Sequence, residues 1–576
     1  MDLAIFRNEL ESAGPSVVQK LYEWAQKKAD KKFLYYGEED RYLSYGDFNA
    51  ITNNIGNFLK SMGIAKGDKI SVYLYNPLIT ALAMFGIWKA GAVYAPINFS
   101  YKGRLLSYQI NDTEPRMFIT EQSRVPFLND AKADLPAVKV LLRTPRRDEH
   151  DYKSDVANVE LDQKFERFDF DNLLEGNSFN LDTKINYWDV ANIIYTSGTT
   201  GSAKGVIQSH RWISQYVYAM RRITHEDDIC YSDLPMYHIG GAFGYLGRVV
   251  WAGSNIAIWD RFSPKGFWKR IEKSGSNTTA LLDIMMPWLM NAEETAKDRC
   301  NSLFRVHMQP LPYNHNKIAR RFGFDLVTTA YGSTETGNPI VSIINELAEG
   351  EGTPKELLKG YSKEYIFKKF LECGYPVFSG TDEIKKGMLG RSYHYEPAIL
   401  NERDEILGAG MSGQLAFRSK LAHGLPDGYF NKPEATVKVN RNQWFHTGDA
   451  CYKDENEIYY YVDRMGSFIR VRGENISSFQ IEDIINSHPS VNIATALGIP
   501  AQEGDEDDLV VYITLKEPMR LEEDELRKWL ASEMPKFMWP KYIRFINDNE
   551  LPRTSTNKIV KYKLQEKILA ELKETK

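Results

Sequence analysis

The sequence has few cysteines, and they lie far apart. Among its 576 residues are only Cys230, Cys300, Cys373 and Cys451, with no CxxC pair. This spacing argues against a disulfide framework and suggests no zinc site. Free thiols are typical of a reducing compartment, so we expect a cytoplasmic protein.

The sequence also lacks a surplus of either charge. Its 72 basic and 77 acidic residues are spread along the chain and give a formal net charge of -5. Nucleic acid binding typically needs a concentrated basic surface, so we expect no nucleic acid partner. The content of 43% hydrophobic and 26% charged residues is that of a folded globular protein. The length predicts two or more domains.

Long apolar runs are missing as well. The N-terminal stretch MDLAIFRNELESAG carries three acidic residues and does not resemble a secretory signal. The most apolar segment, residues 79–97, is interrupted by Lys89 and by glycines, which argues against a membrane span. We expect a buried helix over 79–88, a strand over 92–97 and no integral membrane segment.

The order of the predicted elements indicates an α/β fold. Short apolar strands alternate with segments of helical periodicity between residues 42 and 98, and again after the glycine-rich stretch described below. Residues 382–417 predict a smaller β-rich subdomain. We therefore expect a large N-terminal domain, residues 1–463, of layered α/β subdomains plus this β-rich part. A small mobile α+β domain, residues 464–576, would follow.

Two polar segments interrupt this pattern. Residues 143–184 have few periodic apolar positions and predict a peripheral surface excursion. Residues 340–375 are rich in Glu, Lys and Gly and suggest an insertion near the functional site, with helical patches at 346–350 and 362–373.

One stretch places hydroxyls, glycine amides and a lysine on a turn between a predicted strand and a predicted helix. Glycines let the backbone approach a ligand closely, hydroxyls add neutral donors, and Lys204 supplies positive charge. This chemistry suits phosphates. The pattern is not GxxxxGK[ST], so the ordinary P-loop fold is not implied. The stretch consists of Thr196, Ser197, Gly198, Thr199, Thr200, Gly201, Ser202, Ala203, Lys204 and Gly205.

Further motifs give the stretch a context. YGSTETG (331–337), WFHTGD (444–449), DRMGSFIRVRGENISSFQIED (463–483) and PRTSTNKIVK (552–561) follow it in order. With these motifs the sequence resembles, over almost its whole length, the adenylate-forming superfamily of acyl-CoA synthetases, standalone adenylation enzymes and beetle luciferases. Several motifs in order are more specific than any one of them.

The resemblance implies roles around the nucleotide. Glu335 would bind Mg²⁺, with Thr196 as a second metal ligand, and carboxylate oxygen is a ligand that Mg²⁺ prefers. Thr334 would contact the α-phosphate, and Tyr331 would lie against adenine. The phosphate-binding group would be Thr196, Ser197, Gly198, Thr199, Thr200 and Lys204.

The resemblance also assigns residues in the C-terminal motifs. Asp449 would accept hydrogen bonds from the ribose hydroxyls, with Arg464 as a second contact. Lys558 would bridge the acid and the α-phosphate during adenylation. The C-terminal domain would rotate about Gly466, and the Gly473 loop would then serve thioester formation.

Two departures concern this domain. Lys558 follows Asn557 where relatives have glycine, and asparagine tolerates the left-handed conformation that such a turn needs. Many relatives carry Asp or Lys at the hinge instead of Gly466, so glycine puts the closing equilibrium in question.

Other segments match the acyl side of the site. In MYHIGGAF, His238 and Tyr237 would gate the path between the acid and CoA, although a structural histidine is the alternative. VHMQPLPY places His307, Met308 and Gln309 where small residues are expected. MMPWLM (285–290) would form a wall of the acyl pocket or simply part of the core.

The sequence therefore predicts an ATP-dependent acid:CoA ligase that uses ATP, Mg²⁺ and CoA. The acid would be adenylated with release of pyrophosphate, and CoA would then displace AMP. The sequence, especially RFSPKGFWKRIEKSG (261–275) and VRGENIS (471–477), is similar to the carnitine/crotonobetaine-CoA ligase and fatty acid branch, which implies a fatty acid or a carnitine/crotonobetaine-type acid as the substrate. The alternative is an adenylating enzyme that loads a carrier protein or an amine. Luciferase-like oxygenation stays open, and a non-enzymatic nucleotide binder is disfavoured by the intact motifs. The oligomeric state is open, with a homodimer as one option.

Overall fold

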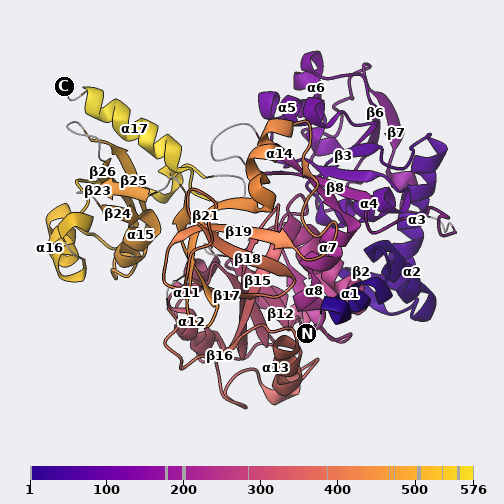
Figure 1. Cartoon of the computed structure of the whole chain (residues 1–576). Coiled ribbons are helices and arrows are strands. Elements are labelled where there is room, and N and C mark those ends of the chain that lie inside the picture. The colour runs from indigo at the N-terminus through magenta and orange to yellow at the C-terminus, as the bar shows by residue number, and fades with distance from the viewer. Residues whose placement is uncertain are drawn as a thin grey trace. The chain divides into compact units, whose positions relative to one another are not determined.

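The computed structural model describes ten stretches of the chain, which folds as two compact units (Figure 1). Unit 1 comprises residues 1–384, 389–396 and 418–440, and unit 2 comprises residues 385–388, 397–417 and 441–576. The described residues are 3–175, 179–196, 203–282, 285–385, 387–465, 468–471, 474–501, 507–534, 536–553 and 558–574.

The first sheet of unit 1 has eight strands in the order β20-β9-β8-β4-β3-β5-β6-β7. From β8 to β7 neighbouring strands run parallel, whereas β8–β9 and β9–β20 are antiparallel. The strand bounds are β3 Lys69–Tyr73, β4 Val93–Pro96, β5 Met117–Glu121, β6 Lys139–Arg143, β7 Glu166–Asp169, β8 Val190–Thr196, β9 Lys204–Ser209 and β20 Gly428–Tyr429.

The second sheet of unit 1 runs β15-β14-β13-β12-β10-β11-β1-β2, with β16 beside β15. Its central strands are parallel, and the hairpins β14–β15 and β1–β2 are antiparallel. The strand bounds are β1 Lys32–Tyr36, β2 Arg41–Ser44, β10 Ile229–Ser232, β11 Asn255–Ile258, β12 Thr278–Leu282, β13 Arg305–Gln309, β14 Leu326–Ser333, β15 Gly337–Asn345, β16 Val377–Ser379 and, paired with β15, β17 Met388–Ser392.

The core of unit 1 is built around a helix that is apolar on every face. All residues of α4 (Pro77–Lys89) are buried, which is expected of a helix without a polar side. At Gly86, an added Cβ would lie 2.4 Å from Ile55, so glycine lets α3 (Tyr45–Ser61) pack closely. The other helices of unit 1 are α1 Leu3–Ser12, α2 Val17–Lys27, α5 Gly103–Thr113, α6 Val125–Ala131, α7 His210–Tyr216, α8 Tyr218–Arg221, α9 Arg248–Ala252, α10 Phe267–Ser274, α11 Met285–Met290, α12 His315–Phe322, α13 Lys363–Glu372 and α14 Pro433–Val439.

Unit 2 contains a four-stranded β-sheet segment and an α+β part. The first consists of β18 Tyr395–Leu400, β19 Gly413–Ser419, β21 Phe445–Lys453 and β22 Tyr459–Arg464, in that order. The second contains the hairpin β23 Phe468–Val471 and β24 Glu474–Ser477, the sheet β25 Val491–Pro500, β26 Asp507–Leu515 and β27 Tyr542–Phe545, and the helices α15 Ser478–Asn486, α16 Glu523–Glu533 and α17 Lys561–Glu574.

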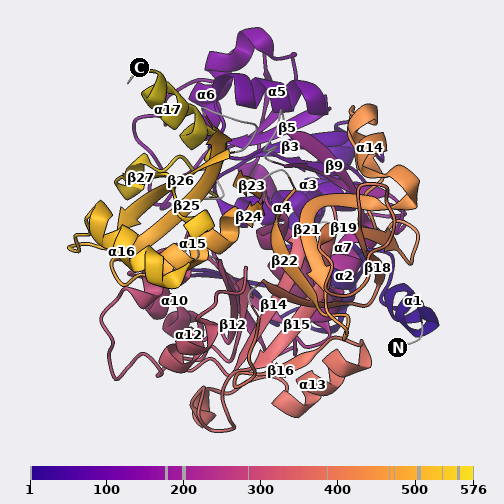
Figure 2. The same cartoon turned by 60° about the vertical axis from the view of Figure 1, so that its left-hand side comes forward.

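The α+β part has a core on each face of its sheet. Val511 of β26 packs in a cluster with Leu526 of α16, whereas its neighbour Val510 packs with Leu564 and Ile568 of α17. Successive side chains of a strand point to opposite faces, which explains the two clusters. Figure 2 shows α15 and α16 on one side of β25–β27 and α17 on the other.

The α/β layering confirms the predicted fold class. The expected helix at 79–88 and strand at 92–97 correspond to α4 and β4. The expected helical patch at 362–373 is α13, but the one at 346–350 is wrong, because these residues form turns after β15. The segment expected as an insertion from 340 begins inside β15, where Ile340 is fully buried, so its first residues belong to the core.

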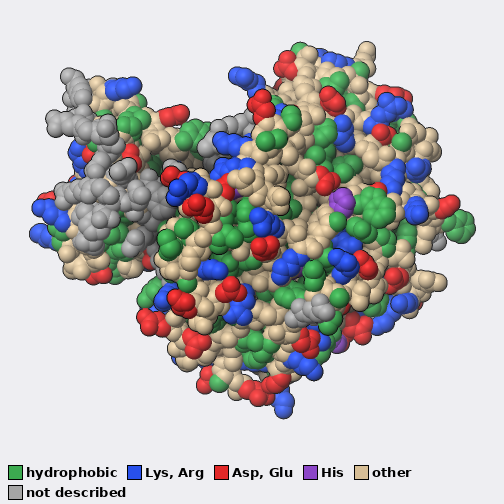
Figure 3. All heavy atoms as spheres, viewed as in Figure 1, with side chains coloured by type: hydrophobic (Ala, Val, Ile, Leu, Met, Phe, Trp, Pro, Cys, Tyr) green, Lys and Arg blue, Asp and Glu red, His purple; other side chains and the backbone are tan. Residues whose placement is uncertain are grey.

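The excursion at 143–184 is less peripheral than predicted, since it contributes the edge strand β7. The domain boundary at 463 and the hinge at Gly466 stay predictions, and Gly466 lies outside the described residues. Within the described ranges, none of the helices has both the length and the apolar character needed to cross a membrane. Figure 3 shows acidic and basic side chains mixed over the face in view.

Candidate active site

The glycine-rich stretch connects two antiparallel strands. Thr196 at the end of β8 pairs with Lys204 at the start of β9, and Thr196 Oγ1 lies 3.5 Å from the Lys204 carbonyl. The expected helix follows as α7 from His210, but the strand β9, which was not predicted, comes between the stretch and this helix. The β-branched Val206 and Ile207 favour a strand there. Ser197, Gly198, Thr199 and Thr200 lie outside the described residues.

Lys204 of the glycine-rich stretch and the expected metal ligand Glu335 both contact Tyr429. Lys204 Nζ lies 5.1 Å from the centre of the Tyr429 ring, and the Tyr429 hydroxyl donates a 2.9 Å hydrogen bond to Glu335 Oε1. Tyr429 sits on β20, which pairs with β9. Sequence reasoning missed this residue, since no motif near it distinguishes it.

The YGSTETG motif forms the turn between β14 and β15. Gly337 has a φ of +66°, which favours glycine. At Gly332 an added Cβ would lie 2.3 Å from Asn338 Oδ1 and 2.7 Å from the Gly337 carbonyl. A side chain at Gly332 would therefore push the two strands apart.

The same turn is tied to the elements that follow the glycine-rich stretch. Gln208 of β9 donates a 2.7 Å hydrogen bond to the Thr334 carbonyl, and Trp212 Nε1 of α7 donates a 2.8 Å bond to the Glu335 carbonyl. These bonds fix the backbone of Thr334 and Glu335, while both side chains stay partly exposed. Tyr331 lies at the buried end of the turn.

This arrangement fits a hard divalent cation. Carboxylate oxygens are the usual protein ligands of Mg²⁺. Tyr429 occupies Glu335 Oε1, and within the described ranges Oε2 takes part in no hydrogen bond or ion pair. Glu335 therefore has one oxygen to orient the carboxylate and a second for a cation.

In unit 2, Asp449 and Arg464 face each other across two strands. They are paired residues of β21 and β22, and Arg464 Nη1 donates a 2.7 Å hydrogen bond to Asp449 Oδ1. Asp449 is 6% exposed, whereas the Arg464 side chain is 49% exposed. Arg464 therefore orients the buried Asp449 carboxylate. Such a carboxylate suits a diol, because the two neighbouring hydroxyls of a diol can both donate hydrogen bonds to it.

Next to this pair, Asp463 joins β22 to α15. It is buried and accepts hydrogen bonds from Ser478 N at 2.7 Å and Ser478 Oγ at 3.0 Å. Lys561 at the start of α17 donates to the same Ser478 hydroxyl at 2.6 Å. Sequence reasoning assigned no role to Asp463, because its partner is fifteen residues away.

Lys558 is an exposed residue of unit 2, next to Ile559. Arg553 and Ile559 form an antiparallel bridge, and Val560 N donates a 2.8 Å bond to the Pro552 carbonyl. Asn557 and Gly473 lie outside the described residues. Thus the expected phosphate and metal ligands belong to unit 1, and the expected ribose and lysine contacts belong to unit 2.

His238 is exposed and precedes a wide helical segment, Gly240–Gly247. Its Nδ1 accepts a 3.2 Å hydrogen bond from Gly240 N, so Nδ1 is the acceptor nitrogen. The neighbouring Tyr237 ring packs edge-on against Phe99, with centroids 5.2 Å apart. A gating role for His238 stays a prediction.

The residues that replace the expected small ones form a polar pair beside the motif turn. His307 Nδ1 lies 3.0 Å from Thr328 Oγ1, and Nε2 lies 3.1 Å from Gln309 Oε1. Burial lowers the pKa of His307 to about 4, with the Gln309 contact acting in the opposite direction. The ring is therefore neutral at pH 7. Gln309 Nε2 lies 3.4 Å from the position of a Cβ on Gly332.

The MMPWLM segment forms α11. Its Met285, Met286 and Leu289 are buried, whereas Trp288 is 36% exposed and stacks on Phe262 with centroids 5.8 Å apart. Most of this helix therefore packs as ordinary core, which was one of the two alternatives.

Comparisons with known proteins agree with these motifs. A family model described as AMP-binding enzyme matches residues 21–430, and one described as AMP-binding enzyme C-terminal domain matches residues 480–558. The crotonobetaine/carnitine–CoA ligase of Salmonella arizonae is 26% identical over 534 residues, which cover 92% of this chain and 94% of that protein. The protein of the same name from Salmonella typhimurium is 26% identical over 533 residues, with 91% and 93% covered.

Two solved structures that match this chain have the same fold. ATP-bound MatB from Rhodopseudomonas palustris gives a TM-score of 0.75 at 20% identity, with 96% of this chain and 98% of that chain covered. The o-succinylbenzoate CoA synthetase of Bacillus subtilis, in complex with its acyl-adenylate intermediate, gives 0.72 at 21% identity, with 96% and 98% covered. At these identities the likeness establishes the fold, and the α/β prediction is confirmed.

Proposed function

The chain belongs to the AMP-binding enzyme family and is an AMP-forming acyl-CoA synthetase, and we propose that its substrate is a small polar acid of the carnitine or crotonobetaine type. The observation that carries the proposal is the His307–Gln309 pair beside Gly332. A polar acid could accept a hydrogen bond from Nε2 of Gln309, whose amide oxygen faces His307, and a long alkyl chain could not.

A pair of stacked aromatic rings beside the same turn would suit a quaternary ammonium ion. The Tyr216 ring stacks on Trp212 with centroids 5.2 Å apart, and its Cδ2 lies 3.1 Å from the position of a Cβ on Gly337. Tyr216 is partly exposed, whereas Trp212 is buried. Aromatic faces attract quaternary ammonium ions through the ring quadrupole. The crotonobetaine/carnitine–CoA ligases that match this chain also support this acid class.

For the nucleotide, we propose ATP as the donor of AMP. Lys204 would neutralise phosphate charge, and Glu335, oriented by Tyr429, would hold Mg²⁺. Asp449, oriented by Arg464, would accept the ribose hydroxyls. The metal would add positive charge against the phosphates.

The reaction proceeds in two steps. In the first, a carboxylate oxygen of the acid attacks the α-phosphorus of ATP, the bond to the β-phosphate oxygen breaks, and pyrophosphate leaves. Lys558 would stabilise the charge that develops on the α-phosphate oxygens. In the second, the CoA sulfur attacks the acyl carbon, AMP leaves, and the thiol proton passes to solvent.

The test is pyrophosphate release over a panel of acids, with and without CoA, combined with detection of the CoA thioester. The panel contains crotonobetaine, L-carnitine, octanoate and palmitate. A matched control is 5,5-dimethylhex-2-enoate, in which carbon replaces the ammonium nitrogen of crotonobetaine. We expect the highest kcat/KM for crotonobetaine or carnitine, and a loss of roughly 10-fold or more for the neutral isostere.

A higher kcat/KM for octanoate or palmitate than for every cationic acid would refute the substrate proposal and favour a fatty acid ligase. Pyrophosphate release without a CoA thioester for any acid would instead favour the alternative, transfer to a carrier protein or an amine. The assay without CoA measures adenylation alone. It therefore shows whether an acid fails at adenylation or only at thioester formation.

A further inference from the structure

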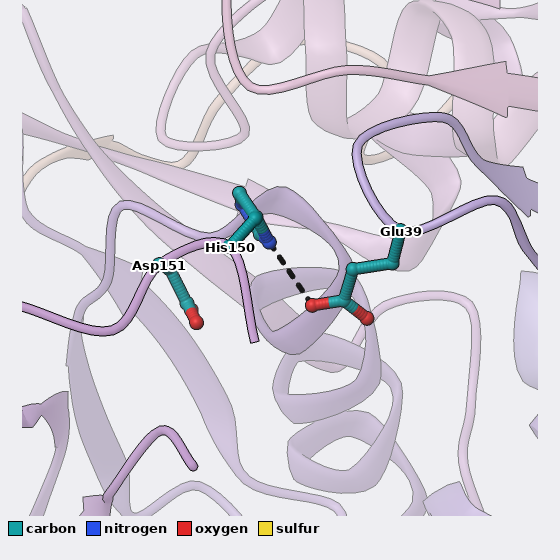
Figure 4. A group of neighbouring side chains, drawn as sticks. All are labelled: Glu39, His150 and Asp151. Atoms are coloured by element: carbon teal, nitrogen blue, oxygen red, sulfur yellow. Dashed lines mark hydrogen bonds and ion pairs between the residues drawn. The ribbon is translucent and has the colours of Figure 1, made fainter. Parts of the chain in front are cut away.

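A second group of candidate metal ligands lies in unit 1 and shares no residue with the candidate active site. Glu39, His150 and Asp151 each offer a ligand atom, and these atoms lie within 4.8 Å of one another. Figure 4 shows the Glu39 carboxylate pointing at the His150 ring, with the Asp151 carboxylate beside them.

The topology explains why distant segments meet here. Strands β1 and β11 are parallel neighbours, with Tyr36 opposite Ile258, so the residues that follow both strands lie at one edge of the sheet. Glu39 follows β1, and Asp260 follows β11. His150 and Asp151 arrive from the polar excursion between β6 and β7.

Both ring nitrogens of His150 face carboxylates. Its Nδ1 lies 3.0 Å from Glu39 Oε1, and its Nε2 lies 3.1 Å from Asp260 Oδ2. Because a carboxylate can only accept, Nδ1–H donates to Glu39 here, and a metal ion on Nδ1 would take the place of that proton. A carboxylate on the far nitrogen is the usual outer partner of a histidine ligand. The Tyr36 hydroxyl donates to the other oxygen of Asp260 at 2.6 Å.

Asp151 supplies a second, independent indication. Its side chain is 8% exposed, and Asn76 Nδ2 donates to Oδ2 at 2.9 Å. Among the described residues, no donor reaches the buried Oδ1 within hydrogen-bond distance, and Arg143 Nη2 is 3.9 Å away. A buried carboxylate oxygen without a hydrogen-bond donor destabilises the folded state, and a cation would remove that cost. Asn76 thus holds the carboxylate in place, while Oδ1 has no hydrogen-bond donor among the described residues and only a long ion pair with Arg143.

The surrounding charges also favour a cation. Three carboxylates, Glu39, Asp151 and Asp260, surround the single imidazole of His150. The nearby Arg143 does not balance them, because it is shared with Glu149 at 2.8 Å and Asp171 at 3.0 Å. The group therefore has more carboxylates than cations in a place that solvent partly reaches.

We propose that Glu39, His150 Nδ1 and Asp151 Oδ1 bind one divalent transition-metal ion, with Zn²⁺ as the best fit. One imidazole and two carboxylates suit Zn²⁺, whereas Ca²⁺ and Mg²⁺ prefer ligand sets made of oxygen alone. Zinc–ligand bonds of about 2.0–2.2 Å place two ligands of a tetrahedral ion about 3.4 Å apart, so the side chains would move slightly inward. The ion would pin the polar excursion to the edge of the second sheet.

The test uses the full-length protein without an affinity tag, in a Cys300→Ser background that removes the exposed thiol. After treatment with a chelator, ZnCl₂ is titrated by calorimetry, and thermal unfolding is followed with and without Zn²⁺. We expect one site per chain and a rise in Tm of about 3 °C or more at 100 times Kd. MgCl₂ should produce neither effect at the same concentrations.

Three variants make the test specific. Asp151→Asn keeps the shape of the side chain but removes its charge, and we expect zinc affinity to fall about 10-fold or more. His150→Gln should remove zinc binding, and His225→Gln, at a histidine outside the group, should leave it unchanged. If His150→Gln does not fold, the comparison between Asp151→Asn and His225→Gln decides. No saturable zinc binding, or equal binding by wild type and Asp151→Asn, would overturn the proposal.

Discussion

The hydroxyl of Tyr429 donates a 2.9 Å hydrogen bond to Glu335, the residue that we expect to hold Mg²⁺. The same ring lies 5.1 Å from Lys204 Nζ. Tyr429 therefore connects the phosphate stretch to the metal ligand, and it does so from β20, a strand of two residues that pairs with β9.

Tyr429→Phe should weaken the use of Mg²⁺ and ATP without disturbing the ring contact with Lys204. A hydrogen bond to a charged group contributes about 1.5–3 kcal/mol, so we expect kcat/KM for ATP to fall roughly 10-fold or more. The measurement is acid-dependent ATP–pyrophosphate exchange at several Mg²⁺ concentrations. Tyr452→Phe, on a tyrosine stacked against Tyr460 in unit 2, is the control. An unchanged Mg²⁺ dependence in Tyr429→Phe would contradict the assigned role.

Asp449→Asn should raise the KM for ATP more than it lowers kcat. The change removes the charge that Arg464 orients and that the ribose hydroxyls would meet, so a rise of roughly 10- to 100-fold is expected. Arg464→Ala should have a smaller effect, because its side chain is half exposed. Steady-state kinetics with ATP as the varied substrate give both values. A larger rise in the KM for ATP in Arg464→Ala than in Asp449→Asn would contradict the proposal that Asp449 is the main ribose contact.

Lys558→Ala should separate the two half-reactions. Removing a cation from a developing charge costs about 100- to 1,000-fold, so adenylation should fall by this factor. Thioester formation from supplied acyl-AMP should stay within a few-fold of wild type. Lys563→Ala, on the following helix α17, is the matched control. Equal losses in both half-reactions would contradict a role for Lys558 in adenylation alone.

His307 should make the protein less stable in acid. Burial lowers its pKa to about 4 in the folded state, below the value of 6.5 for an unperturbed histidine. The folded state therefore disfavours the protonated ring. The stability from neutral His307 is complete above pH 6.5 and is lost as the pH falls toward 4.

The test of this linkage compares wild type with His307→Gln by chemical denaturation at pH 7.0 and 4.5. We expect the loss of unfolding free energy on acidification to be smaller in the variant by about 1–3 kcal/mol. His225→Gln should show the same loss as wild type. If His307→Gln loses as much as wild type, neutral His307 does not contribute to the pH dependence.

The sequence predicted those parts of the fold and the site that depend on neighbouring residues. The apolar run at 79–97 was sufficient for α4 and β4, because burial on all faces is visible in composition. The motif residues Asp449 and Arg464 were predicted together and are paired. Tyr429 was not predicted, because it lies 94 residues from Glu335 and reaches it through strand pairing.

Other features that the sequence did not predict also depend on pairing between distant strands. The strand β9 at the end of the glycine-rich stretch was not predicted, because it depends on pairing with β8 and β20. The Glu39–His150–Asp151 group comes from two segments 111 residues apart in sequence. Within a local window these are ordinary polar surface residues, and only the parallel pairing of β1 and β11 creates the edge where they meet.

Asp463 should stabilise unit 2 by capping α15. It accepts hydrogen bonds from the backbone and the hydroxyl of Ser478, and Arg464 N donates to its other oxygen at 2.7 Å. Asp463→Ala removes these acceptors from a buried place, so we expect a loss of about 2–3 kcal/mol in unfolding free energy. Ser478→Ala removes only the hydroxyl contacts and should cost less, about 1 kcal/mol.

Trp529 provides a local probe for this comparison, because its ring packs against His488 beside the core of the α+β part, with centroids 4.9 Å apart. The contribution of Trp529 to the fluorescence change on unfolding is obtained by comparison with the Trp529→Phe variant. The expected order of stability is wild type, Ser478→Ala, then Asp463→Ala. Because Asp463 and Ser478 lie on opposite sides of the predicted hinge at Gly466, Asp463→Ala should also change the ratio of adenylation to thioester formation. A change in stability at an unaltered ratio would leave Asp463 as a helix cap and contradict its coupling to domain rotation.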